Sequence, residues 1–279
     1  MTTASPSTLT LDRCAVHTRT NKPWSLVECC EAYASKGIGG VSVWQDVAEC
    51  VGMREAQAIV RGNGLRVPAY VRGGFFTAHD AADRTKALDD NRRLIDEAGV
   101  LDAKMLVLVV GATPKLPLAE ARAQVAAGIE ELLPHAESTG VKLAIEPLHP
   151  MYADDKSCIN RTTDARAICE RLASPMLGVA LDVYHTWWDP ALEAEIEKLG
   201  ANNQLFGFHV CDWKQNTGHL LTDRGLMGDG CIDVRGIRAM VESTGFDGMI
   251  EVEVFSESYW ASDQNSYLDL IVDRLGTHT

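Results

Sequence analysis

The feature that most constrains the fold is a regular alternation, along the whole chain, of short apolar stretches with longer segments of helical periodicity. Eight of the apolar stretches are rich in β-branched residues and have the length of buried strands. They cover residues 12–18, 40–45, 66–73, 105–111, 142–148, 177–183, 205–212 and 248–255. This alternation is typical of parallel strands joined by crossover helices. The sequence therefore predicts an α/β protein built from eight strand-helix units.

Segments between these strands carry helical patterns, most clearly at 25–37, 119–140 and 234–245, and each of these three ends with a glycine that favours a left-handed helix cap. No Pro/Ser-rich linker or change of composition divides the 279 residues. We therefore predict a single domain, residues 1–279, with the closed (β/α)8 architecture of a TIM barrel. An open, doubly wound sheet is the alternative, because periodicity does not report closure.

Composition narrows the range of partners. The formal net charge of −13 would repel phosphate backbones, so we expect no nucleic-acid partner. The N-terminus lacks a basic segment followed by an apolar one, and no stretch approaches the roughly 20 apolar residues of a membrane span. We expect a cytoplasmic protein with no membrane partner. A GxGxxG turn after the first strand and a P-loop are both absent from the sequence, so neither nucleotide site has support.

The eight cysteines form no CxxC pair, and most stand in apolar segments. We interpret them as reduced packing residues, because a chain with its own core has little need of a disulfide framework. Cys211, two residues after His209, is the one candidate for a reactive thiol.

Four polar residues stand at or near the carboxyl ends of the last four predicted strands, where the active sites of TIM barrels lie. Glu146 ends "LAIE", Asp182 ends "VALD", His209 lies in "FGFHV" and Glu253 lies in "IEVEVF". Each could be an isolated helix cap or surface ion pair, which is the commoner role for any one of them. Four in register at successive strand ends favour a shared site.

Alternation along a strand places residues two positions apart on the same face. Small residues stand two positions before three of the four polar ones, namely Ala144, Ala180 and Gly207. They leave room for the polar groups to converge inside the barrel. Glu251 competes with Glu253 on the eighth strand, and we select Glu253 because it lies nearer the carboxyl end.

Two Glu, one Asp and one His offer mostly hard oxygen donors with one nitrogen. Such a set suits Mn²⁺, Mg²⁺ or Co²⁺ better than a metal that seeks thiolates. Clustered carboxylates would otherwise repel one another and raise each other's pKa values. The four residues therefore predict a site for one divalent cation.

Five segments carry a resemblance to a known family: "AIEPLHPMYADD", "LDVYHTWWDP", "GFHVCDW", "DRGLMGDGCIDV" and "FDGMIEVEVFS". Through them, and most specifically over residues 140–260, the chain resembles the xylose isomerase-like barrel superfamily. The similarity is greatest to its sugar phosphate isomerase/epimerase branch, which includes ketose 3-epimerases and inosose dehydratase.

The resemblance implies that Glu146, Asp182, His209 and Glu253 bind one divalent metal, usually manganese. It also implies that two further residues bind substrate oxygens: His185, in a D-x-x-H motif, and Arg224, before the glycines of "DRGLMGDG". Ketose 3-epimerases carry a further glutamate where this chain has Tyr152, and His149 stands in the same stretch. We include His149 among the candidate substrate-binding residues.

We expect a metal-dependent sugar isomerase or epimerase that abstracts the proton alpha to a carbonyl and passes through a metal-stabilised enediolate. Glu146 and Glu253 are the candidate acid and base. Indole faces pack against the C–H faces of sugars. Trp187 is therefore a candidate substrate contact, and four other tryptophans stand in the predicted loops: Trp44, Trp188, Trp213 and Trp260.

Three other functions are compatible with parts of this pattern. A lyase or dehydratase acting on a keto-inositol, 3-keto-sugar or glycoside would share the metal and the first proton abstraction, then expel a β-leaving group. A phosphodiesterase of the AP-endonuclease kind would need more histidine ligands and a basic surface. A non-catalytic sugar-binding barrel would not need the two glutamates. For every function considered except the phosphodiesterase, the expected partner is a small carbohydrate. The resemblance also implies a possible homo-oligomer.

Overall fold

The eight strands close into a barrel in which each strand pairs in parallel with its neighbours in chain order, and β1 pairs with β8. The computed structural model describes residues 8–279. Its strands are β1 (Cys14–His17), β2 (Gly40–Trp44), β3 (Ala69–Gly74), β4 (Met105–Val109), β5 (Lys142–Ile145), β6 (Leu177–Asp182), β7 (Leu205–Val210) and β8 (Ile250–Val252). Closure confirms the predicted TIM barrel and rules out the open sheet.

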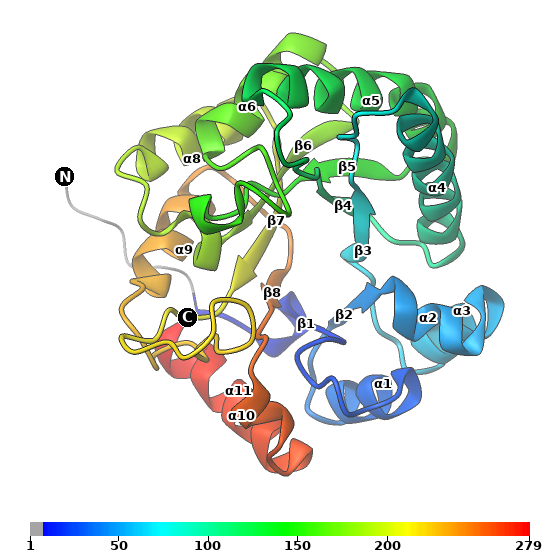
Figure 1. The fold of residues 1–279 in the computed structure, drawn as a ribbon. Helices are drawn as coiled ribbons and strands as arrows, with labels where there is room; N and C mark the ends of the chain where they lie inside the picture. The colour runs from blue at the N-terminus through cyan, green and yellow to red at the C-terminus, as the bar shows by residue number, and fades with distance from the viewer. Residues whose placement is uncertain (1–7) are drawn as a thin grey trace.

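Helices surround the barrel on its outer side (Figure 1). The longer ones are α1 (Leu26–Ser35), α3 (Met53–Gly62), α4 (Ala81–Val100), α5 (Leu118–Thr139), α6 (Thr162–Leu172), α8 (Leu192–Ala201), α9 (Val234–Ser243) and α11 (Gln264–His278). Shorter turns of helix are η1 (Leu11–Arg13), α2 (Gln45–Val51), η2 (Pro150–Tyr152), α7 (Val183–Thr186) and α10 (Glu257–Trp260). The three helices predicted from the sequence correspond to α1, α5 and α9.

Local sequence signals account for helix ends. Ser25 and Glu28 form a reciprocal capping box at the start of α1: the Ser25 side chain accepts the N–H of Glu28, and the Glu28 side chain accepts the N–H of Ser25. Gly140 ends α5 in the left-handed conformation, with φ of 74°. These ends turn the chain back toward the next strand.

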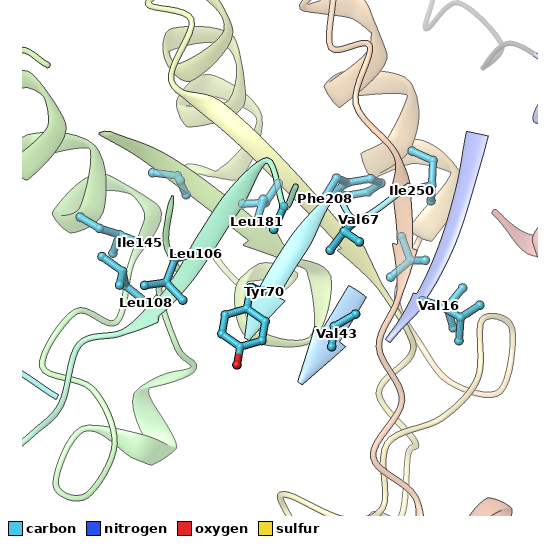
Figure 2. Close-up of a cluster of buried hydrophobic side chains, with 14 of the residues drawn as sticks. Val16, Val43, Val67, Tyr70, Leu106, Leu108, Ile145, Leu181, Phe208 and Ile250 are labelled. Carbon is cyan, nitrogen blue, oxygen red and sulfur yellow. The ribbon is translucent and has the colours of Figure 1, made fainter. Parts of the chain in front are cut away.

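Side chains of the strands divide between two layers. Outward-facing ones such as Tyr70, Leu181 and Phe208 pack in the cluster between barrel and helices (Figure 2). A separate inner cluster fills the barrel below the site. Its buried members are Trp44, Ala69, Val71, Met105, Val107, Ala144 and Ala180. A Cβ on Gly207 would lie 2.4 Å from the Met105 Cε, so the long Met105 side chain occupies the space that this glycine leaves.

Six of the eight cysteines are buried, as the packing interpretation requires, but Cys50 and Cys231 are exposed. For these two the packing interpretation is wrong, because Cys50 in α2 and Cys231 in the loop before α9 are accessible to solvent. Burial raises the pKa of the Cys211 thiol well above its ordinary value, which argues against the reactive role considered for it. Within residues 8–279, no helix combines the length and apolar character that crossing a membrane requires.

Gly74 lies where β3 and β4 are in close main-chain contact, and a substitution there tests this packing. Its φ is +109°, and a Cβ there would lie 2.1 Å from the carbonyl oxygen of Val109. We expect Gly74→Ala to lower the free energy of unfolding by at least about 2 kcal/mol, because it adds backbone strain and a clash with main chain. The midpoint of urea-induced unfolding measures this.

Gly62→Ala is the matched control, because no atom lies within 4 Å of a Cβ at Gly62, at the end of α3. Alanine favours helix more than glycine does, so this variant should be neutral or slightly more stable. Equal unfolding midpoints for the two variants would contradict the packing described at Gly74.

Candidate metal centre

The four polar residues predicted at the strand ends meet at the mouth of the barrel. Glu146 follows β5, Asp182 ends β6, His209 lies in β7 and Glu253 follows β8. Each offers one possible ligand atom, and the four atoms all lie within 4.8 Å of one another. All four side chains are buried. The structure thus brings together the full set that the sequence singled out.

Hydrogen bonds fix the orientation of these side chains. Asp182 caps the short helix α7, since its Oδ1 accepts the N–H of Tyr184 at 2.8 Å. Its Oδ2 accepts Nη1 of Arg224 at 2.7 Å. The Nδ1 atom of His209 lies 3.1 Å from Glu146 Oε1 and 3.9 Å from Glu253 Oε2. His209 therefore turns its Nδ1 toward the carboxylates.

Burial and charge work against one another in this cluster. Burial, reinforced by the charge of Glu253, raises the pKa of Asp182 to about 7 even with Arg224 beside it. Burial disfavours protonation of His209, but the surrounding carboxylates, Glu251 foremost, outweigh it and raise the pKa of His209 to about 10. Without a cation, protons bound by Asp182 and His209 thus offset part of the negative charge of the cluster. A divalent cation would fit this donor set and replace those protons.

His185 and Arg224, the two residues assigned to substrate oxygens, lie side by side and are buried. The main-chain N–H of His149 donates to His185 Nδ1 at 3.2 Å, which places the ring proton on Nε2. That Nε2 lies 3.2 Å from Arg224 Nη2. Arg224 also donates to Glu253 Oε2 at 3.1 Å, and its guanidinium stacks 4.4 Å from the Tyr184 ring centroid.

Arg224 reaches the site from a long loop after β7 because Asp212 anchors that loop. Asp212 pairs with Gly225 in an antiparallel bridge. Its carboxylate accepts main-chain N–H groups from Gly228 and Gly230 at 3.0 and 2.8 Å, and from Ile232 at 2.9 Å. One buried carboxylate therefore holds the returning strand of the loop against the barrel.

A cavity of about 320 Å³ opens beside the cluster. Glu146, Glu253, His185 and Arg224 line it. Its remaining walls are largely aromatic and aliphatic, with several basic side chains. They include Trp44, Tyr152, Phe255 and Trp260, and Arg19, Lys22, Arg72 and Lys156. A cavity of this size, with a few convergent polar groups, is typical of a small-molecule site.

Trp187 and His149, the other two candidate substrate contacts, do not line this cavity. Both belong to an aromatic cluster around Trp213, with ring centroids 5.9 Å and 5.1 Å from that indole. Of the five loop tryptophans, Trp44 and Trp260 line the cavity instead. The sequence alone did not show which of the loop tryptophans line the cavity and which pack outside it.

Two further polar side chains lie inside the barrel beside the cluster: His17, which is not among the candidates predicted from the sequence, and Glu251, which was set aside in favour of Glu253 as the ligand. The ring of His17 makes an edge contact with that of His209, at 4.7 Å between centroids. Its Nδ1 lies 3.3 Å from Glu253 Oε1 and accepts the indole N–H of Trp44 at 3.2 Å. The available signal was alternation, which places Glu251 on the same face as Glu253.

Comparisons with known proteins agree with the fold. A model of the family described as xylose isomerase-like TIM barrel matches residues 30–271. An inosose isomerase from Halalkalibacterium halodurans is 24% identical over 190 residues, which are 67% of this chain and 65% of that relative. The match therefore leaves about a third of the relative's length uncovered.

Among solved structures, a protein from Sinorhizobium meliloti 1021 is 44% identical with a TM-score of 0.92, over 95% of this chain and 98% of that one. The IOLI protein, solved with a bound zinc atom, is 18% identical with a TM-score of 0.83, over 95% of this chain and 99% of that one. This second likeness is one of fold. Because the family model covers most of the chain, the protein belongs to the xylose isomerase-like TIM barrel family.

Proposed function

We propose that this chain is a metal-dependent sugar isomerase or epimerase that removes the proton alpha to a carbonyl group. The observation that carries the proposal is the convergence of two Glu, one Asp and one His ligand atom within 4.8 Å, at the edge of a cavity large enough for a small carbohydrate. The inosose isomerase relative supports the same reaction class. Proton abstraction next to a carbonyl is the chemistry that such a site favours.

The metal would be held by Glu146, Asp182, His209 and Glu253. Three carboxylates and one imidazole form a donor set of mostly hard oxygens, for which we propose Mn²⁺, with Mg²⁺ or Co²⁺ as alternatives. The zinc in the IOLI protein supports a divalent cation in a barrel of this fold. When bound, the ion supplies the positive charge that makes a C–H bond beside a carbonyl acidic.

Glu146 and Glu253 are the proposed acid and base. Both line the cavity, and they come from two different strand ends, β5 and β8. One removes the proton and the other returns a proton, from the opposite side of the carbon if the reaction is an epimerisation. Arg224 donates to Glu253 and favours its charged form, which is the form that a base needs.

His185 and Arg224 are the proposed substrate clamp. The Nε2–H of His185 and the Nη2–H of Arg224 lie 3.2 Å apart and are both donors. Two donors cannot satisfy one another, so a substrate hydroxyl or carbonyl oxygen that accepts from both is their natural partner. Trp44, Phe255 and Trp260 provide ring faces for the C–H surface of a sugar and exclude water from the charged groups.

Metal binding is the first test. We expect the chelated, metal-free protein to lose turnover and to regain it with Mn²⁺. We also expect saturating Mn²⁺ to raise the melting temperature, because an ion that binds the folded state stabilises it by about 2.7 kcal/mol at a hundred times its dissociation constant. Thermal scans with Mn²⁺, Mg²⁺, Co²⁺ and Zn²⁺ measure this. A melting temperature that none of the four ions changes would oppose the proposed site.

Proton transfer is the second test. We expect Glu146→Gln and Glu253→Gln each to slow solvent-deuterium incorporation at the carbon alpha to the carbonyl by roughly 10²- to 10⁴-fold, because each removes one acid-base group. Ketoses, keto-inositols and 3-keto-glycosides are the substrates to screen by NMR. Glu257→Gln is the control, because Glu257 lines the same cavity but is exposed and stands outside the four-residue cluster.

Three outcomes of this assay separate the reactions. Near-normal exchange in either cluster variant would refute the acid-base assignment. Isomerisation by the wild type without deuterium incorporation would indicate a hydride shift. An ultraviolet-absorbing unsaturated product would indicate β-elimination, and the enzyme would then be a lyase.

A further inference from the structure

Glu251 lies on β8, one level below the cluster, and only 1% of its surface is exposed. In the sheet it stands opposite His209 of β7 and Ala15 of β1. Its Oε2 accepts the hydroxyl of Ser42 at 2.6 Å. A carboxylate buried this deeply needs more than one donor to offset its lost hydration. The identity of the other donors indicates what the residue does.

Two imidazole nitrogens face the same carboxylate oxygen. His17 Nε2 lies 3.5 Å and His209 Nε2 lies 3.8 Å from Glu251 Oε2. Both nitrogens are buried, and within residues 8–279 neither has a hydrogen-bond partner. Both distances lie outside the usual hydrogen-bond range of about 2.7–3.2 Å, so neither contact is a hydrogen bond as it stands, and ring shifts of roughly half an ångström would bring both nitrogens within range. Glu251 is therefore placed to receive both.

The other nitrogen of each ring determines which one carries the proton. His17 Nδ1 accepts the indole N–H of Trp44, so the His17 proton belongs on Nε2. His209 turns Nδ1 toward Glu146 and Glu253, so a metal would bind there and the proton would again belong on Nε2. Both Nε2–H groups then point at one acceptor.

We infer that Glu251 is a positioning residue that holds His209 in the Nε2–H tautomer required for metal binding through Nδ1, and that holds His17 so that Trp44 forms the cavity wall. The inference rests on the metal site proposed above. Metal-binding histidines generally donate their second N–H to a carboxylate or carbonyl, which fixes the ring and makes it a stronger ligand. Here one carboxylate links the metal ligand to an aromatic wall of the substrate cavity.

Glu251 is not a further ligand in this arrangement. His209 turns Nδ1 toward Glu146 and Glu253 of the cluster, whereas Glu251 faces Nε2 on the other side of the ring. Within the described residues, Glu251 belongs to neither group of side chains whose donor atoms converge. This position explains why the eighth strand carries two glutamates on one face.

The test measures the dissociation constant of Mn²⁺ for the full-length protein, by electron paramagnetic resonance of the free ion. We expect Glu251→Leu to bind Mn²⁺ 10- to 100-fold more weakly than the wild type, since that is the usual effect of losing such a partner. Glu251→Gln should lose less, because its amide oxygen can still accept one N–H.

Glu195→Gln is the matched control. Glu195 is also buried, with 3% of its surface exposed, but it pairs with Arg166 at 2.5 Å on the outer helices α6 and α8. Its loss should lower stability without changing the affinity for Mn²⁺. If Glu251→Leu fails to fold, as circular dichroism would show, the comparison of Glu251→Gln with Glu195→Gln decides the question.

Histidine tautomers provide a readout that a merely structural role would not change. In zinc-loaded protein labelled with ¹⁵N-histidine, we expect slowly exchanging Nε2–H signals from His17 and His209 in the wild type and in Glu195→Gln. Both signals should be lost or exchange rapidly in Glu251→Leu.

The outcomes separate this inference from the proposed function. A wild type that binds no divalent ion would overturn both. A wild type that binds Mn²⁺, together with Glu251 variants of equal affinity and unchanged histidine signals, would overturn the positioning role alone and leave the metal site in place.

Discussion

Side chains of a closed parallel barrel point alternately into its interior and toward its helices, and this alternation decides what the centre can hold. Ala144, Ala180 and Gly207 leave space in the barrel interior below the site, and the Met105 side chain occupies part of it. The residues two positions later in each strand then emerge at the mouth with room to converge. The cluster depends on this spacing, because a larger residue at any of the three positions would occupy the space beneath it.

Charge is the second constraint on the centre. Glu146, Asp182, Glu251 and Glu253 are all buried within one small volume. Arg224 pairs with two of them, and His209 lies within 4 Å of the other two. Such an assembly works against the stability of the fold, since every member loses hydration and several repel one another. Sites of this kind are retained for their chemistry, and the apolar layer outside the barrel supplies the stability that they lack.

Much of the fold and of the cluster could be predicted from the sequence. The eight apolar stretches rich in β-branched residues were enough to predict the barrel fold. Each strand of such a barrel is buried on both faces, so its sequence is an almost continuous apolar run. Glu146 and Asp182 stood out because they end apolar runs at successive strands, in register with His209 and Glu253 on the next two. The catalytic and ligand roles of these residues stay predictions.

The remaining features depend on contacts across the barrel, which periodicity does not encode. His17 and Glu251 are brought together by the pairing of β1 with β8, at opposite ends of the chain. Trp187 was a candidate substrate contact because indole faces pack against sugars, but at the end of α7 it lies against Trp213 instead. Loop side chains can face either way, and only tertiary packing selects the direction.

The anchoring of the loop after β7 has a consequence for how this barrel can diversify. Asp212 ties the returning strand near Gly225, and the Lys214–Asp223 ion pair at 2.7 Å closes the base of the loop tip. Most of the residues between 215 and 219 are exposed beyond that closure. Exposed loop tips tolerate insertions and deletions, so this tip can vary in length and sequence while the guanidinium of Arg224 and the four-residue cluster keep their places.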